Sequence, residues 1–172
     1  MKLIAHRGLI NGPDVNLENR PEQIKLALSQ GFDCEIDLWV INSEFYLGHD
    51  RPDYAVDKKF LDHFGLWIHA KNLAALRWLT DTTSLCYFWH ENDKFTLTSN
   101  KFIWTFPGNE LTQRSIAVLP EWHDPEFKTL PSNCYGICSD YVVTIKENLT
   151  PLQGISTPLI AVRFCYAGPN LL

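Results

Sequence analysis

Short apolar segments alternate with amphipathic ones along the first half of the chain. Residues 3–5 are apolar and are followed directly by polar residues, which is typical of a buried strand that ends in a loop. Apolar residues in the segment 19–31 fall at helical spacing and predict a helix. Apolar and acidic side chains then alternate over residues 32–40, which predicts a strand that gathers its acids on one face.

Local signals set the expected limits of that first helix. Asn19 with Glu22 three residues later resembles a capping box, and Pro21 suits the first helical turn. Gly31 is a typical helix stop. We therefore expect Asn19 to cap a helix that ends before Gly31.

The rest of the chain repeats the pattern. It predicts one helix over 56–64 and another after the cap residue Asn72, with Leu73, Leu76 and Leu79 facing inward. Residues 95–97 are expected to form a small hairpin with the next segment of the chain. Further strands are expected over residues 45–47, 66–71, 84–89, 101–106, 115–119, 134–139 and 158–166.

This order of elements predicts a fold class. Strands that alternate with helices imply a parallel sheet wrapped by helices, and polar residues gather after the strand ends, where α/β barrels place their chemistry. We expect an α/β fold of the (β/α) TIM-barrel type, as a single domain over 1–172. Such barrels usually need about 250 residues, and only residues 107–114 separate two of the later strands. The barrel should therefore be compact, with a trimmed or irregular second half.

Composition and charge narrow the partners. A net charge of −5 without any run of Lys or Arg argues against nucleic acid as a partner. No apolar run reaches the length of about 20 residues that a transmembrane segment needs, and the first residues do not resemble a signal peptide. Five scattered cysteines favour reduced thiols in a cytoplasmic protein. The sequence leaves the oligomeric state open.

Two acids on one strand are the first candidates for chemistry. Glu35 and Asp37 are two residues apart, so both side chains project to the same face. Adjacent buried acids repel one another unless a cation lies between them, which points to a Mg²⁺ or Ca²⁺ site. The alternative is an ordinary acidic face turned to solvent.

Basic and aromatic residues near the strand ends complete the candidate set. His6 and His49 are the candidate acid and base. Arg7 either grips a phosphate oxygen or pairs with Glu18, or does both. Lys71 would neutralise charge in the transition state. Trp104 is a candidate wall of the substrate pocket, although core packing is the commoner use of such a residue.

Taken in order, these motifs resemble the glycerophosphodiester phosphodiesterase family, which is related to phosphatidylinositol-specific phospholipase C. The match covers residues 4–50, and Ser139-Asp140-Tyr141 is a weaker match to the end of the family's last strand. The motifs are His6-Arg7-Gly8, Glu18-Asn19, Ala27 with Gly31, Glu35-Ile36-Asp37 and His49-Asp50.

The resemblance implies roles residue by residue. His6 and His49 would do the acid–base work, and Arg7 would bind phosphate. Lys71 would contact the substrate and stabilise its charge, and Glu35 and Asp37 would bind metal. The chain departs from the family at position 69, where a Glu usually completes the metal site and this sequence has His69. As a ligand, His69 favours Zn²⁺ or Mn²⁺ over Mg²⁺ or Ca²⁺. Otherwise an acid such as Glu91 or Glu121 replaces the missing ligand, or metal binding is weaker.

The sequence thus predicts a metal-dependent phosphodiesterase that cleaves a small glycerophosphodiester-like molecule. One histidine would take the proton of the attacking hydroxyl or water, and the other would protonate the leaving alkoxide. The alternative is a non-catalytic domain on the same scaffold that binds a phosphate or phosphosugar group. His69 and the short barrel are the features that favour this alternative.

Overall fold

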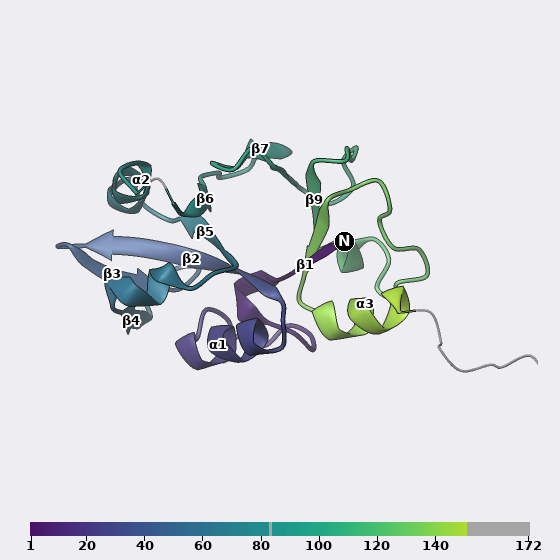
Figure 1. The fold of residues 1–172 in the computed structure, drawn as a ribbon, viewed down its shortest axis with the longest axis horizontal. Coiled ribbons are helices and arrows are strands. Elements are labelled where there is room, and N and C mark those ends of the chain that lie inside the picture. The colour runs from purple at the N-terminus through teal and green to yellow at the C-terminus, as the bar shows by residue number, and fades with distance from the viewer. Residues whose placement is uncertain (83, 151–172) are drawn as a thin grey trace, which may run out of the picture.

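A computed structural model describes residues 1–82 and 84–150 of the chain. Its strands form one ten-stranded sheet that curls into a half-barrel (Figure 1). The strands are β1 (Lys2–Ala5), β2 (Asp33–Ile41), β3 (Glu44–Leu47), β4 (Tyr54–Val56), β5 (Leu66–Ala70), β6 (Cys86–Phe88), β7 (Phe95–Leu97), β8 (Ile103–Thr105), β9 (Ser115–Val118) and β10 (Gly136–Ser139).

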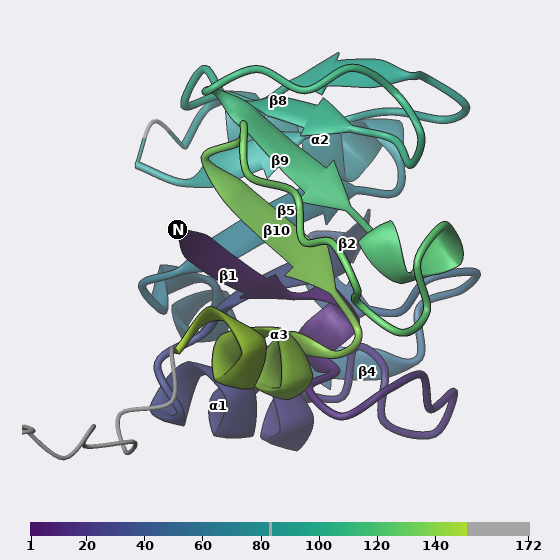
Figure 2. The same cartoon turned by 90° about the vertical axis from the view of Figure 1, so that its right-hand side faces the viewer.

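Few helices accompany this sheet in the described part of the chain. The α-helices are α1 (Pro21–Ser29), α2 (Leu73–Thr80) and α3 (Val142–Leu149), and short 3₁₀ helices cover His6–Gly8, Lys58–Asp62 and Pro120–Trp122. Figures 1 and 2 both show α1 and α3 below the sheet and α2 at its upper side. None of the helices between residues 1 and 150 has the length and apolar character needed to cross a lipid bilayer.

The sheet is mixed. Its parallel strands run in the order β6, β5, β2, β1, β10, β9 and β8. The antiparallel strands are β3 and β4, which continue from the end of β2, and β7, which pairs with β8. Figure 2 shows β8, β9, β10 and β1 side by side. Because β1 bonds to both β2 and β10, the first and last described strands meet in the middle of the sheet.

The expectation of a (β/α) TIM-type barrel is wrong. The structure has a mixed, curled sheet and three short α-helices in its described residues, so strands and helices do not alternate around a barrel. The segment predicted as a helix over 56–64 instead ends β4 and forms the 3₁₀ helix Lys58–Asp62. Between β6 and β10 the connections contain loops and one 3₁₀ helix in place of α-helical crossovers.

Most of the individual strands were predicted correctly from the sequence. Each predicted strand up to residue 139 coincides with a strand of the sheet, and β7 forms the expected hairpin with β8. The predicted strand 158–166 lies outside the described residues. Asn72 caps α2 as expected, because its side chain accepts a hydrogen bond from the Ala75 N–H at 2.9 Å. Leu79 faces inward, whereas Leu73 is 75% exposed, so the inward prediction for Leu73 is wrong.

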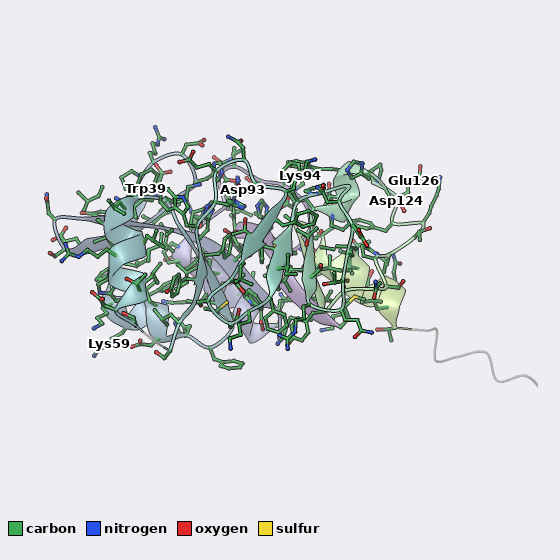
Figure 3. All side chains as sticks on the ribbon, turned by 90° about the horizontal axis from the view of Figure 1, so that it is seen from above. Trp39, Lys59, Asp93, Lys94, Asp124 and Glu126 are labelled. Atoms are coloured by element: carbon green, nitrogen blue, oxygen red, sulfur yellow. The ribbon has the colours of Figure 1, made fainter. Side chains whose placement is uncertain are left out.

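The two faces of the sheet have different cores. Because the sheet is curled, α1 below it and α2 at its upper side both pack on the same outer face (Figure 1), where they bury the apolar residues of β2 and β5, such as Ile36 and Ile68. The other face holds a separate aromatic cluster that includes Trp67, Phe88 and Trp104. Seen from above in Figure 3, Trp39 and Lys59 lie at one end of the molecule, and Asp124 and Glu126 lie at the other.

Candidate functional site

The end of β1 delivers the first two candidate residues. His6, Arg7 and Gly8 form a 3₁₀ turn in which Arg7 adopts the left-handed conformation, with φ of 50°. Hydrogen bonds hold this turn: the Arg7 N–H donates to Glu35 Oε2 at 3.0 Å, and the Arg7 carbonyl accepts from the Asn19 N–H at 2.8 Å. Gly8 has φ of 80°, and a Cβ there would lie 2.9 Å from Ile24 Cγ1. The turn therefore requires glycine at that position.

Strands β2 and β5 bring the acidic and basic candidates together. Asp37 and His69 are direct neighbours in the parallel register of these strands, and Lys71 follows two residues after His69. The side chain of Glu35 shares a strand face with that of Asp37. Glu35, Asp37 and His69 are all buried. The alternative that the two acids form a solvent-facing pattern is thereby excluded.

Asp37 is the centre of the cluster. Its Oδ1 accepts a hydrogen bond from His69 Nδ1 at 3.0 Å and lies 3.4 Å from Lys71 Nζ. Its Oδ2 accepts from Asn19 Nδ2 at 2.8 Å and lies 3.5 Å from Arg7 Nε. Burial alone would raise the pKa of Asp37, but these donors and positive charges outweigh it and hold the pKa well below its usual range. Asp37 is therefore an ionised carboxylate.

Glu35 lies in a different electrostatic environment. Burial and the negative charge of Asp37 raise the pKa of Glu35, and the neighbouring basic groups only partly offset this. One carboxylate oxygen accepts from the Arg7 N–H, and within residues 1–82 and 84–150 the other has no hydrogen-bond partner. The two acids on one strand face thus have unequal proton affinities.

The Arg7 guanidinium is held by acids from two sides. Its Nη1 donates to Glu18 Oε2 at 2.7 Å, while Nε is buried and has no hydrogen-bond partner among the described residues. The pairing with Glu18 foreseen from the sequence is confirmed. The side chain as a whole remains 20% exposed.

His6 belongs to a chain of polar groups that joins β1 to β10. His6 Nδ1 lies 2.8 Å from Asp140 Oδ1, and the Asp140 N–H donates to Glu121 Oε1 at 2.9 Å. Burial alone would lower the pKa of His6, but the hydrogen bond to Asp140 and the charge of Glu35 outweigh it, and the pKa is raised. A raised pKa favours the doubly protonated, cationic form of the His6 ring.

His49 lies after β3, on a more open part of the site. Gly48 before it has φ of 149°, and a Cβ there would lie 2.1 Å from the Arg51 carbonyl oxygen, so only glycine fits. The Gly48 carbonyl accepts a hydrogen bond from Trp39 Nε1 at 2.6 Å. Burial is the main cause that lowers the pKa of His49, and the charges of Arg7 and Lys71 lower it further. His49 is therefore disposed to be neutral.

The two histidines are thus tuned in opposite directions around one guanidinium. The charge of Arg7 acts on both imidazoles, so both lie within its electrostatic reach. Groups whose surroundings push their pKa values apart are suited to act as an acid–base pair. The surroundings of His6 thus suit it to donate a proton and those of His49 suit it to accept one, a division that the sequence alone left open.

His69 has hydrogen-bond partners for both ring nitrogens. Nδ1 faces the Asp37 carboxylate, and Nε2 lies 3.3 Å from the carbonyl oxygen of His90. The rings of His69 and His90 meet edge to face, with centroids 4.5 Å apart. Burial and the charges of His69 and Lys71 lower the pKa of His90 to about 4, so His90 is neutral at physiological pH.

The fit of a metal ion can be tested on these contacts. Glu35, Asp37 and His69 each offer one ligand atom within 4.8 Å of the others, a spacing that an ion can bridge. However, both oxygens of Asp37 already accept hydrogen bonds, and both nitrogens of His69 face acceptors. A metal ligand needs a free lone pair, and His69 has none left. Each Asp37 oxygen keeps a second lone pair, but Lys71 Nζ or Arg7 Nε lies 3.4 or 3.5 Å from it and would repel a metal cation. In this arrangement the donor set does not fit a metal ion.

Trp104 lies in the aromatic core, stacked on Phe88, which in turn stacks on His69. It is 4% exposed, and its ring centroid lies 4.6 Å from that of Phe88 and 6.0 Å from that of Trp67. An indole this enclosed has little surface left for a substrate. Its contacts support a packing role.

Three residues of the site were assigned no catalytic, substrate-binding or metal-binding role from the sequence. Asn19 was expected to cap α1, but the N-cap is Arg20 and has no side-chain cap, so that prediction is wrong. Asn19 instead binds Asp37 through both its amide nitrogen and its amide oxygen. Asp140 and His90 also contact predicted site residues. Their positions after β10 and β6 were visible in the sequence, but their partners lie far away along the chain.

Comparison with known proteins adds no relative: no protein-family model, curated protein or solved structure matches the chain. The resemblance to glycerophosphodiester phosphodiesterases therefore rests on the motif residues alone and stays a prediction.

Proposed function

We propose that the protein is a phosphodiesterase that cleaves a small phosphodiester by acid–base catalysis. The observation that best supports this is the opposite tuning of His6 and His49 around the Arg7 guanidinium. Cleavage of a phosphodiester requires one group that accepts a proton from the nucleophile and one that protonates the leaving oxygen. The site provides one candidate for each task.

Arg7 and Lys71 are suited to hold the phosphate. Both side chains are partly exposed, at 20% and 15%, and both are tethered to Asp37 by charge. A guanidinium and an ammonium would bind the two non-bridging phosphoryl oxygens and offset the charge that grows on them in the transition state. Their anchoring by buried acids means that little reorganisation is needed when a substrate binds.

The chemical step follows from the protonation states. Neutral His49 takes the proton of the attacking hydroxyl, which belongs to water or to the substrate itself, as the new P–O bond forms. Protonated His6 gives its proton to the departing alkoxide as the old P–O bond breaks. Asp140, hydrogen-bonded to His6, stabilises the imidazolium before transfer and orients the ring. The reaction leaves His49 protonated and His6 neutral, so a proton must return through solvent before the next turnover.

The resemblance of the motif residues makes a glycerophosphodiester our choice of substrate. The net charge of −5 argues against nucleic acid as the natural phosphodiester. The four cysteines within the described part of the chain are free thiols, which supports a cytoplasmic location as part of this proposal.

Release of alcohol from a glycerophosphodiester, and of phenolate from a chromogenic aryl phosphodiester, tests the proposal. We expect His6→Ala and His49→Ala each to lower kcat by about 10²–10⁴-fold, the usual contribution of a general acid or base. The aryl substrate separates the two, since its leaving group needs less help from an acid and His6→Ala should be milder on it. His63→Ala, at an exposed histidine outside the site, is the matched control and should retain full activity.

Full activity in either site variant would contradict the assignment. A wild-type protein that a glycerophosphodiester stabilises against heat, yet that releases no alcohol from it, would instead support the alternative of a phosphate-binding domain.

A further inference from the structure

The histidine at position 69 is the feature that departs from the resembled motif, and its contacts suggest why. His69 is buried between Asp37 on β2 and the His90 carbonyl after β6, and its ring stacks on Phe88 with centroids 5.1 Å apart and planes inclined by 8°. Packing on the ring face and hydrogen bonds at both nitrogens fix the ring in one orientation. A ring held in this way cannot turn a nitrogen elsewhere without losing at least one hydrogen bond.

The partners of the ring determine where its protons are. A backbone carbonyl can only accept, so His69 Nε2 must donate to His90. Asp37 is ionised and already accepts from Asn19, so His69 Nδ1 must donate to it as well. An imidazole that donates from both nitrogens carries two ring protons and a positive charge. Such a ring has no lone pair for a metal ion.

Side chains of the protein, and not a bound ion, therefore supply the positive charge around the two acids. Asp37 has His69, Lys71 and Arg7 as cationic neighbours at 3.0, 3.4 and 3.5 Å. Two buried acids on one strand face require nearby positive charge. Here three side chains supply it, and they lie where a bound cation would compete with them.

We propose that His69 is a fixed imidazolium that takes the place of a catalytic metal ion, so that the site works without a divalent cation. The role of His69 in catalysis rests on the phosphodiesterase activity proposed above. His69 acts as a positioning residue: it holds Asp37, and through Asp37 it holds Arg7 and Lys71 where the phosphoryl oxygens bind. The carboxylate that a metal would use as a ligand serves instead to organise cations that belong to the protein.

Two measurements test this inference without relying on activity. In the first, ¹⁵N-histidine NMR of the chelator-treated full chain at neutral pH should show a ring with both nitrogens protonated that remains in His6→Ala, and His69→Gln should remove that signal. In the second, equilibrium dialysis with Mn²⁺ should show no saturable binding to the wild type at millimolar concentration. His69→Glu should raise Mn²⁺ affinity by at least about tenfold, because three adjacent carboxylates form a typical site for a hard cation.

Activity gives the third readout. The wild type should retain its full rate in a chelator, and His69→Gln should lose most of its rate, because an amide can hold Asp37 but supplies no charge. A single-proton ring at His69, or stoichiometric Mn²⁺ binding that Asp37→Asn abolishes, would overturn the inference. If His69→Glu fails to fold, the wild-type and His69→Gln measurements still decide it. A wild type with no activity under any condition would count against the proposed function, whereas NMR and dialysis would still decide the state of His69.

Discussion

At the residue scale, Asn19 has a role that its sequence position conceals. Its backbone has φ of 57°, a conformation that asparagine tolerates better than most residues. Its side chain donates to Asp37 Oδ2 and accepts from the Asp37 N–H at 2.9 Å. One side-chain amide thus gives a hydrogen-bond partner to both the carboxylate and the backbone N–H of Asp37. The residue is fully buried. Asn19 therefore fixes the carboxylate on which the cations of the site depend.

Replacement of Asn19 by Ala should destabilise the fold. The variant leaves a buried carboxylate oxygen and a buried N–H each short of a partner, and hydrogen bonds to charged groups are worth about 1.5–3 kcal/mol. We expect the free energy of unfolding in urea to fall by about that amount. Asn16→Ala is the matched control, because that asparagine is exposed, and it should lie within about 0.5 kcal/mol of the wild type. Equal stability of the two variants would show that Asn19 is not an anchor.

The pH dependence of the rate also belongs to the residue scale. His49 must be neutral to accept a proton, and its pKa is lowered, so activity should rise as pH increases through a value below the ordinary histidine pKa of about 6.5. His6 must be protonated to donate, and its pKa is raised, so activity should fall as pH increases through a value above it. A bell-shaped profile of kcat/KM with its plateau near that ordinary value is the expected result. A profile that rises without an alkaline limb would refute the assignment of His6 as the acid.

At the element scale, the antiparallel pair β3 and β4 takes the place where an alternating fold would have a helix. Strand β2 continues past the site, turns at Asn42 and Ser43, both with positive φ, and returns as β3. The next loop then carries His49 at the end of β3. The hairpin thus returns the chain to the level of Asp37 on β2, and this places His49, one of the proposed catalytic histidines, near Asp37.

The Trp39 indole links the two ends of this hairpin. Its N–H donates to the Gly48 carbonyl at 2.6 Å, directly before His49. Trp39→Phe keeps the ring and removes the donor, and a neutral hydrogen bond is worth about 1 kcal/mol. We expect kcat to fall by up to about tenfold because His49 is less well placed, with little change in KM. Trp122→Phe, at an indole that is 61% exposed, should leave kcat unchanged. If both variants behave alike, the loop holds His49 without help from Trp39.

Elements differed in how far the sequence could define them. Strands β1, β2 and β5 were predictable because their apolar runs and alternation are intrinsic to each segment. The segment 56–64 was not, because a short amphipathic stretch suits a 3₁₀ turn as well as a helix, and tertiary pairing of β4 with β3 decides between them. The acids and bases of the site were predictable as types at strand ends. Apart from the pair of Arg7 with Glu18, their partners were not, since contacts such as His69 with the His90 carbonyl depend on the register of distant strands.

At the scale of the whole molecule, the site depends on the meeting of the two ends of the described chain. His6 follows β1 and Asp140 follows β10, and the two residues are 134 positions apart. Their contact exists because β1 and β10 pair in parallel, from Lys2 opposite Gly136 to Ala5 opposite Ser139. A shift of this register by one residue would reverse the faces on which the side chains lie. The proton affinity of His6 therefore depends on the pairing of β1 with β10.

This dependence leads to a prediction about Asp140. Asp140→Asn keeps a hydrogen-bond acceptor beside His6 and removes the negative charge, so the pKa of His6 should fall. The alkaline limb of the rate profile should then move to lower pH, and kcat at neutral pH should decrease. Asp50→Asn is the control, because Asp50 makes the equivalent contact with His49 but is 89% exposed, where solvent screens its charge.

The two variants compare the partly buried pair of His6 and Asp140 with the exposed contact of His49 and Asp50. Asp50→Asn should leave the alkaline limb in place and shift the acidic limb only slightly, since its hydrogen bond is the weakest of the influences on His49. If Asp140→Asn leaves the alkaline limb where it is, then either His6 is not the acid or the pairing of β1 with β10 does not set its proton affinity. ¹⁵N-histidine NMR of the same variant distinguishes these cases. An unchanged His6 titration would show that the pairing of β1 with β10 does not set the pKa of His6. A shifted His6 titration with an unchanged rate profile would show that His6 is not the acid.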